Sequence, residues 1–187
     1  MKFKTENCLF NGDENIEEII NGCRNKDRKA QELLYRSYFR AMMTLCVRYT
    51  RNETDAMDVL NTGFYKVFKN IEKYDSKKAA LYTWMRTIII NSCLSFIKSN
   101  TTRADWKELD QGIDISIEPA VFTKMSSADI LQLVRQLPPS TQAVFNLYVM
   151  EGYSHKEIGS LLGISDNTSK WHLCEARRIL QALINKR

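Results

Sequence analysis

Residues 152–178 read GYSHKEIGSLLGISDNTSKWHLCEARR, a stretch that predicts two helices joined by a tight turn. Ser154 and Glu157 have the spacing of a capping box, in which each side chain hydrogen-bonds the backbone amide of the other residue. Gly163 suits the left-handed end of the first helix, and Ser165 is a favoured N-cap for the second. We therefore expect a helix-turn-helix, although an ordinary helical hairpin has the same layout.

The apolar residues of this stretch recur at helical spacing, namely at Ile158, Leu161, Leu162, Leu173, Ala176 and Leu180. The residues that this pattern leaves on the outer side of the second helix are Asn167, Lys170, Trp171, His172, Glu175, Arg177 and Arg178. Amide, imidazole and guanidinium groups on such a face suit a helix in the major groove of DNA. Trp171 would stack on a sugar or base, or pack on a partner helix. Ser169 leans toward the buried side, where an aliphatic residue would pack better.

The composition favours a mostly helical protein, because the 187 residues include only seven Gly and three Pro. No apolar run is long enough to span a bilayer, and Met1–Phe10 lacks the apolar core of a secretory signal. We therefore expect a cytoplasmic protein. The five cysteines are scattered without a C-x-x-C pair, and there are only two His. Reduced, mostly buried thiols are expected, with no metal site and no cofactor.

Positive charge is concentrated in two parts of the chain, although the formal net charge is only +5. Residues 26–100 carry fourteen Lys and Arg against seven Asp and Glu, and residues 154–187 carry six against three. Residues 101–123 are acidic, with two against five. This distribution predicts two contact points on a polyanion, separated by an acidic connector.

The helical periodicity divides the chain into two groups of helices. The helices expected in the first group are Ile16–Ile20, Asp27–Tyr49, one that Thr54 caps, and Ala80–Lys98. Residues 99–122 have no helical period and contain acids, Gly112 and Pro119, so they read as a linker. In the second group, a helix that begins at Ser126–Asp129 ends at Pro138-Pro139, and Ser140 is expected to cap a further helix ahead of the helix-turn-helix.

The expected helix at residues 80–98 combines aromatic rings with cations and amides. It opens with Leu81-Tyr82-Thr83-Trp84, and its later polar positions are Arg86, Asn91, Ser95 and Lys98. Single-stranded nucleic acid binds such surfaces, because bases stack on rings while cations follow the phosphates. Trp84 alone is not decisive, since its spacing from Ile88 also suits a core residue. Three further lysines, Lys73, Lys77 and Lys78, lie on the preceding loop.

Two groups of motifs resemble conserved regions of bacterial sigma factors. Asp55-Ala-Met-Asp58-Val-Leu-Asn61-x-x-Phe64, Lys73-Tyr74-Asp75 and the stretch from Leu81 to Asn91 resemble region two. Leu137-Pro138, Gly152–Ser165 and Ala176-Arg177-Arg178 are similar to region four. Region three is missing as a folded domain, which resembles the extracytoplasmic-function group of the sigma-70 family. The resemblance covers most of the chain from about residue 27 onward.

The resemblance implies an all-α fold of two small helical domains joined by an extended linker. The implied divisions are an arm with a short helix at 1–26, a region 2 domain at 27–99, an acidic linker at 100–123 and a region 4 domain at 124–187. The implied function is that of an RNA polymerase sigma factor in promoter recognition, DNA melting and transcription initiation, without catalysis of its own. The implied partners are core RNA polymerase, promoter DNA as duplex and as melted single strand, and an anti-sigma factor.

The site residues that the resemblance implies fall into three sets. Binding of core polymerase is implied for Asp55, Asp58, Asn61 and Phe64. Contact with the minus-ten element is implied for Lys73, Tyr82, Thr83, Trp84, Arg86, Asn91 and Lys98. Contact with the minus-thirty-five element is implied for Ser165, Asn167, Thr168, Lys170, Trp171, His172, Glu175, Arg177 and Arg178. The chain differs from the family pattern at Thr87, Ser169 and Trp171, among other positions.

Two other function classes compete with this interpretation. A repressor or activator could bind duplex DNA alone, as a dimer that uses the helix-turn-helix at a palindrome. The helix suited to a melted strand argues against it. A nucleic-acid enzyme with Asp55 and Asp58 as metal ligands is disfavoured, because acids are common in the first turn of a helix. No Walker loop or H-E-x-x-H motif is present in the sequence.

Overall fold

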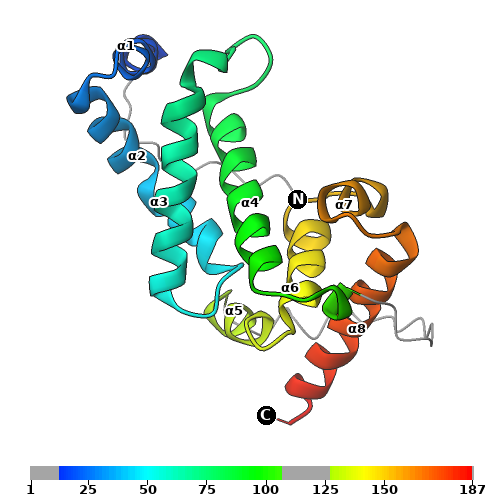
Figure 1. Ribbon diagram of the computed structural model, residues 1–187. Helices are drawn as coiled ribbons and strands as arrows, with labels where there is room; N and C mark the ends of the chain where they lie inside the picture. Colours follow the sequence, from blue (N-terminus) through cyan, green and yellow to red (C-terminus); the bar gives the residue numbers. More distant parts are fainter. Residues whose placement is uncertain (1–12, 107–126, 187) are drawn as a thin grey trace. The chain divides into compact units, whose positions relative to one another are not determined.

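The computed structural model describes residues 13–106 and 127–186, and every regular element in these ranges is helical (Figure 1). The chain divides into two compact units. The first comprises Met1–Val47 and Asn52–Cys93, and the second comprises Arg48–Arg51 and Leu94–Arg187. The all-α fold with two helical domains is therefore confirmed.

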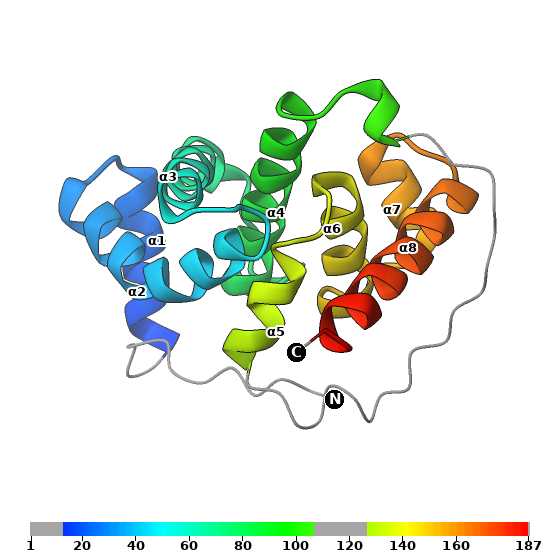
Figure 2. The same cartoon turned by 90° about the horizontal axis from the view of Figure 1, so that it is seen from below.

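The first unit is built from long helices. Its elements are α1 (Asp13–Arg24), α2 (Arg28–Val47), α3 (Glu53–Asn70), the short 3-10 helix η1 (Ile71–Lys73) and α4 (Leu81–Ser99), whose last turns belong to the second unit. Helix α2 packs against both α1 and α3 (Figures 1 and 2). The expected opening helix at Ile16–Ile20 is thus the middle of a longer one.

The core of the first unit follows from the apolar stripes of its helices. Its largest fully buried side chains are Leu34, Met42, Leu60, Phe64, Ile71, Met85, Ile89 and Ile90. The Phe64 ring lies 4.6 Å from that of Tyr35 and 6.0 Å from that of Phe68, measured between centroids. Burying one such side chain stabilises a fold by about 1.5–3 kcal/mol. These contacts hold α2 and α3 together.

The second unit contains shorter elements and ends in a long helix. They are η2 (Arg103–Trp106), α5 (Ser127–Val134), α6 (Pro139–Phe145), the π-helix η4 (Asn146–Met150), α7 (His155–Leu162) and α8 (Asp166–Ile184). Helix α8 packs against α6 and α7. Its buried apolar residues Leu173, Ala176 and Leu180 are those that the helical period predicted. Most of the expected linker lies outside the described residues.

Two local predictions about helix ends need correction. Helix α3 is capped by Asn52 and not by Thr54, because the Asn52 side chain accepts a 2.8 Å hydrogen bond from the Asp55 amide. Helix α6 begins with Pro139 at its first turn, so Ser140 lies inside it and is buried. Proline is favoured at this position because its missing N–H would be unpaired there anyway. The π-helix η4 was not predicted at all.

The described cysteines are free thiols, and three of the four are buried. Burial, with a smaller effect from Asp27, raises the pKa of Cys23 to about 11, so this thiol stays protonated. Cys174 is half-buried on α8, and Cys8 lies outside the described residues. Within residues 13–106 and 127–186, no helix has both the length and the apolar character to cross a membrane.

Candidate nucleic-acid interface

The turn between α7 and α8 is capped as the sequence predicts. The Ser154 hydroxyl accepts from the Glu157 amide at 3.3 Å, while a Glu157 carboxylate oxygen accepts from the Ser154 amide at 2.8 Å. Gly163 ends α7 in the left-handed conformation, with φ of 74°. Ser165 caps α8 by accepting from the Thr168 amide at 2.9 Å. The predicted helix-turn-helix is therefore confirmed in its local geometry.

A glycine inside α7 lets the turn come close to this helix. A Cβ atom at Gly159 would lie 2.8 Å from the backbone oxygen of Ile164 and 3.2 Å from a carboxylate oxygen of Asp166. The Gly159 carbonyl accepts from the amides of both Gly163 and Ile164. The absence of a side chain at residue 159 thus allows the turn to fold back and fixes where α8 begins.

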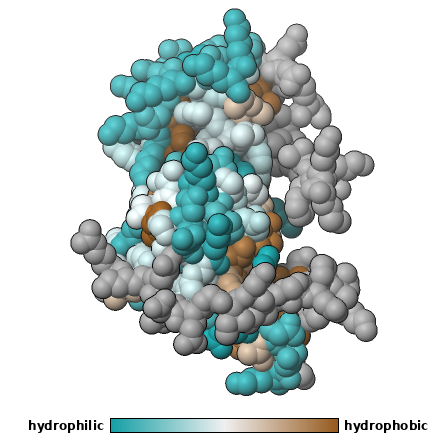
Figure 3. Space-filling model, turned by 90° about the vertical axis from the view of Figure 1, so that its right-hand side faces the viewer, coloured by the Kyte–Doolittle hydropathy of each residue, from teal (hydrophilic) through white to brown (hydrophobic). Residues whose placement is uncertain are grey.

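The outward side of α8 carries polar and charged residues. Asn167, Lys170 and Arg178 are exposed, and Trp171, Glu175 and Arg177 are half-buried. The side of the molecule that carries α7 and α8 in Figure 1 shows hydrophilic residues together with pale and hydrophobic ones (Figure 3). This side of α8 can therefore offer amide and cationic groups to an anionic partner.

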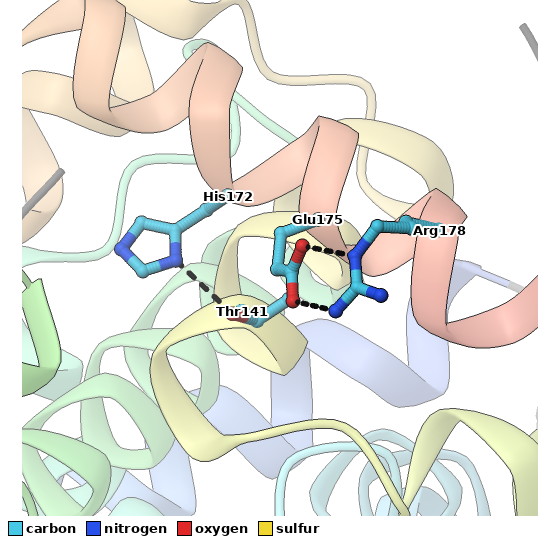
Figure 4. Close-up of polar contacts among 4 residues, drawn as sticks. All are labelled: Thr141, His172, Glu175 and Arg178. Carbon is cyan, nitrogen blue, oxygen red and sulfur yellow. Dashed lines mark hydrogen bonds and ion pairs between the residues drawn. The ribbon is translucent and has the colours of Figure 1, made fainter. Parts of the chain in front are cut away.

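Arg178 is held by its neighbour one turn earlier on the same helix. Its guanidinium donates to the two carboxylate oxygens of Glu175 at 2.7 and 2.6 Å (Figure 4). These hydrogen bonds raise the pKa of Arg178, which stays cationic in any case. The pair fixes the direction of the guanidinium but also offsets part of its positive charge.

Helix α4 presents one polar stripe along its exposed side. Its exposed residues recur every three or four positions at Thr83, Thr87, Asn91, Ser95 and Lys98. The half-buried Tyr82 and Trp84 flank the start of this stripe. Trp84 is therefore neither a fully buried core residue nor a freely exposed one. Within the second unit, the Lys98 ammonium donates to the carbonyl of Leu161 at 2.9 Å.

The loop before α4 is held in shape by Tyr74. Its hydroxyl donates to the carbonyl of Ala79 at 3.1 Å, and its ring lies 5.3 Å from that of Trp84. Arg24 of α1 donates to the Tyr74 carbonyl at 2.9 Å. The loop lysines Lys77 and Lys78 are exposed. Rings, backbone and cations are thus brought together at the start of α4.

The acidic start of α3 is partly engaged by its own cap. The side-chain amide of Asn52 donates to a carboxylate oxygen of Asp55 at 2.9 Å, whereas Asp58 is exposed. Asn61 is also exposed, and its side-chain oxygen accepts from the Tyr35 hydroxyl at 3.1 Å. In residues 13–106 and 127–186, no three His, Cys, Asp or Glu side chains are grouped to hold a metal ion.

Comparison with known families matches both units. The family described as Sigma-70 region 2 matches residues 34–103, and the one described as Sigma-70, region 4 matches residues 127–180. Together the two matches cover most of the chain and include α3, α4, α7 and most of α8. The chain belongs to the sigma-70 family, as an extracytoplasmic-function sigma factor.

Similar proteins agree with this assignment over almost their whole length. The sigma factor is 24% identical over 179 residues to the RNA polymerase sigma-H factor of Pseudomonas aeruginosa, covering 89% of this chain and 92% of that one. It is 22% identical over 175 residues to the ECF RNA polymerase sigma-E factor of Haemophilus influenzae, with 87% and 92% covered. Its role is accordingly in transcription initiation.

A solved structure supports the fold. The sigma factor RpoE from Bartonella quintana, solved in complex with the anti-sigma factor NepR, superposes with a TM-score of 0.52 at 20% identity. The superposition covers 83% of this chain and 95% of that one. The likeness is one of fold.

Three predicted contact residues are buried, and the hydroxyl of a fourth is engaged in a helix cap. His172 of the sigma factor was expected on the outer side of α8, but only 1% of it is exposed. Thr168 is 8% exposed and lies beside the cap residue Ser165, where their two hydroxyls are 2.9 Å apart. Phe64 is 2% exposed, so its ring belongs to the core of the first unit. Ser165 is exposed, but its hydroxyl serves the helix cap.

The buried position of His172 has a geometric reason. Its Nδ1 lies 3.1 Å from the Thr141 hydroxyl of α6 (Figure 4). Burial lowers its pKa to about 4, although Glu175 acts in the opposite direction. The imidazole is therefore neutral near pH 7. A helical period alone placed His172 at the edge of the outer face, and it could not reveal a hydroxyl on another helix.

The sequence analysis also missed two exposed apolar residues of the first unit. Tyr65 is 65% exposed on α3, one turn after Asn61, and Leu33 is 52% exposed on α2. An aromatic residue opposite the buried stripe of α3 was the available signal for Tyr65. Exposed rings of this kind are enriched in protein interfaces. Tyr65 is therefore a further candidate for the surface that binds a protein partner.

Proposed function

We propose that α8 of this sigma factor reads the upstream, minus-thirty-five element of a promoter as duplex DNA in the major groove. The observation that carries this proposal is the two-sided character of α8, with Asn167, Lys170 and Arg178 exposed and Leu173, Ala176 and Leu180 buried. Amides and guanidinium groups can form hydrogen bonds with base edges, and cations can pair with phosphates. Residues 124–187 then act as the region 4 domain.

Helix α4 and the loop before it take up the melted strand of the downstream, minus-ten element. Tyr82, Trp84 and the exposed lysines Lys77 and Lys78 offer rings for stacking and cations for phosphates. Splaying a base out of a duplex costs a few kcal/mol, and stacking on an aromatic ring returns about 1–3 kcal/mol per base. The balance is so close that melting needs the polymerase as well. Residues 27–99 then act as the region 2 domain.

Core RNA polymerase binds the exposed side of α3. Asp58 and Asn61 are exposed there, with Tyr65 one turn beyond, and Asp55 is half-exposed. An acidic helix with an aromatic residue beside it complements a basic partner surface. The sigma factor then works where the polymerase is, in the cytoplasm, and contributes recognition without catalysis of its own.

Run-off transcription tests this function directly. Core polymerase freed of sigma factors is incubated with fragments of genomic DNA, with and without the full chain. We expect new start sites only when the chain is present, and weak binding of promoter DNA by the chain alone. A chain that footprints a palindrome alone and creates no start sites would act as a repressor or activator instead.

An anti-sigma factor is the further partner that we propose. The support is the related fold of RpoE from Bartonella quintana, which was solved in complex with the anti-sigma factor NepR. Affinity purification of the tagged chain from its native cells tests this proposal. When the chain does not direct transcription in the cell, we expect a second protein to co-purify with it. When it does direct transcription, we expect core polymerase to co-purify instead. Recovery of polymerase alone under all conditions would contradict it.

A further inference from the structure

Each of the two histidines of this chain forms a polar pair between α8 and a neighbouring helix. The chain contains two His, and each lies close to a hydroxyl on another helix. His155, the first residue of α7, has its Nδ1 2.9 Å from the hydroxyl of Ser169 on α8. His172 on α8 has its Nδ1 3.1 Å from the hydroxyl of Thr141 on α6. One polar pair thus joins α8 to α7, and the other joins α8 to α6.

These pairs lie where apolar contacts are usual. Ser169 has no exposed surface, His172 is 1% exposed and Thr141 is 2% exposed. Neither His172 nor Thr141 can exchange its partner for water. The Nε2 atom of His172 has no hydrogen-bond partner among the described residues, which costs stability in a buried site. Aliphatic residues at both positions 141 and 172 would avoid that cost, so stability alone does not account for the pair.

Neighbouring rings fix the direction of both imidazoles. The Tyr148 ring stacks on His155 with 4.5 Å between centroids. The rings of Trp171 and Trp106 meet His172 edge-on, at 4.9 and 5.9 Å. Each Nδ1 therefore has little freedom to follow its hydroxyl if α8 turns. Hydrogen bonds weaken steeply with distance and angle, whereas apolar contacts tolerate sliding and repacking.

The positions of the pairs relate directly to the outer face of α8. Ser169 and His172 lie three residues apart, so they share the buried side of the helix. Lys170 follows Ser169 by one residue and is exposed. A step of one residue turns a helix by about 100°. Any rotation of α8 that kept its apolar contacts but broke the two pairs would redirect Asn167 and Lys170.

We propose that the pairs His155–Ser169 and His172–Thr141 are positioning pairs, which set the rotation of α8 against α7 and α6 and so select the side chains that reach the promoter duplex. This inference rests on the proposed role of α8. It assigns no base contact to either histidine. It also gives Ser169 a purpose at a position where the family pattern has an aliphatic residue.

The test compares a variant that loses the hydroxyl with one that keeps it. Thr141→Val preserves the shape of the side chain and removes the hydrogen bond, and Thr141→Ser keeps the hydroxyl. For the other pair, Ser169→Ala removes the hydroxyl and with it the hydrogen bond. His155→Asn keeps a hydrogen-bonding group, because the asparagine amide lies near the position of Nδ1. Each full-length variant is combined with core polymerase. Initiation is then measured at a promoter found by run-off and at templates with single substitutions in its upstream element.

We expect Thr141→Val and Ser169→Ala to lower initiation about tenfold and to change the order of preference among the upstream substitutions. Thr141→Ser and His155→Asn should stay within about twofold of the wild type and keep its order of preference. Thermal melting confirms that each variant is folded at the assay temperature. A template with a preformed bubble and no upstream element should be used equally by all of them. If Thr141→Val is unfolded at the assay temperature, the comparison of Ser169→Ala with His155→Asn tests the positioning role instead.

The outcomes separate the two proposals. The positioning role alone is overturned if the wild type initiates normally and the two variants at residue 141, Thr141→Val and Thr141→Ser, either match it or lose initiation to the same extent. Changes in melting temperature without any change in base preference would also overturn it, since they indicate packing only. A wild-type chain that creates no start sites with core polymerase would reject the proposed function and, with it, this inference.

Discussion

Glu175 is the residue that limits the positive charge on the outer side of α8. Its carboxylate binds the Arg178 guanidinium in a bidentate pair, so the two charges largely cancel. Lys170, about two turns closer to the helix start than Arg178, is exposed. Arg178 and Lys170 are therefore not equivalent: Arg178 is oriented and partly neutralised, while Lys170 acts as a point charge.

Replacing Glu175 should strengthen binding to duplex DNA. Glu175→Gln removes one negative charge next to the phosphates, so we expect a several-fold gain in affinity at low salt. The slope of log K against log salt should become steeper by about one unit. Lys170→Ala should act in the opposite direction and lower promoter use about tenfold. Fluorescence anisotropy of the full chain with a labelled duplex, over a salt series, measures the first effect.

The matched control for this prediction is Glu72→Gln. Glu72 is exposed in η1 of the first unit, so the substitution makes the same change in net charge in the unit that does not contain α8. An equal gain from Glu72→Gln would mean that only total charge matters. In that case the pair with Arg178 has no special part in duplex binding.

His172 makes the stability of the second unit depend on pH. Its pKa is about 4 in the folded chain against 6.5 in a free imidazole, because burial disfavours the charged form. A histidine with a lowered folded pKa contributes full stability above pH 6.5, and this contribution is lost as the pH falls from 6.5 toward 4. Burial and Lys170 also lower the pKa of His155, so its contribution has the same sign. At about 1.4 kcal/mol per pKa unit, His172 accounts for roughly 3 kcal/mol.

Urea unfolding at pH 7.5 and pH 4.5 checks this expectation. Tryptophan fluorescence is a suitable signal, since Trp106 and Trp171 both contact the His172 ring. We expect His172→Leu to be less stable than the wild type at pH 7.5, because Thr141 loses its partner, but to lose less stability on acidification. If both chains lose the same free energy between the two pH values, the carboxylates and not His172 are responsible.

At the scale of the elements, the close approach of the turn to α7 depends on Gly159. In an isolated helix, Gly159→Ala would be favourable by about 0.8–1.0 kcal/mol. Here the new Cβ would lie 2.8 Å from the Ile164 backbone oxygen, which cannot move aside as a flexible side chain would. We expect a net loss of about 1–3 kcal/mol in the free energy of unfolding of the second unit, as for other overpacked sites.

Thermal and urea unfolding measure the effect, with Ser160→Ala as the control. Ser160 is the exposed neighbour on the same helix, and substitutions at such positions usually change stability by less than about 0.5 kcal/mol. Promoter initiation should fall with Gly159→Ala and stay unchanged with Ser160→Ala. A Gly159→Ala chain that is more stable than the wild type would show that the turn can open without cost.

The helical elements were predictable where a local signal determines them. The capping box at Ser154, the left-handed Gly163 and the cap at Ser165 are all determined by neighbours within four residues. The cap of α3 was misplaced because Asn52 and Thr54 are both good caps and lie two residues apart. The π-helix η4 has no comparable signature in the sequence, since its hydrogen bonds depend on how Asn146–Met150 pack.

The candidate site was predictable only for its exposed positions. The polar stripe of α4 and the outward residues Asn167 and Lys170 follow from helical period. The buried hydrogen bonds of Ser169 and His172 do not, because their partners lie 14 and 31 residues away in the sequence. Tertiary packing decided these two positions.

At the scale of the whole molecule, this sigma factor has two units, each of which reads one promoter element in the proposed function. The first carries the start of the polar stripe of α4, up to Asn91, and the loop that Tyr74 holds, and the second carries α8. Neither unit alone identifies a promoter in the proposed function, since one reads duplex and the other reads a melted strand. Specificity then depends on the sequence of each element and also on the distance between them.

The spacing between the two promoter elements should therefore be as important as their sequences. Inserting five base pairs turns one element by about half a helical turn relative to the other, because B-DNA repeats every 10–10.5 base pairs. Both units cannot then engage in the arrangement that core polymerase imposes, so we expect initiation to fall by more than about tenfold. Run-off transcription on templates with altered spacers measures this, with a scrambled spacer of unchanged length as the control. Equal initiation from the insertion and the scrambled templates would mean that only one element is read, and that the two units do not act together on one promoter.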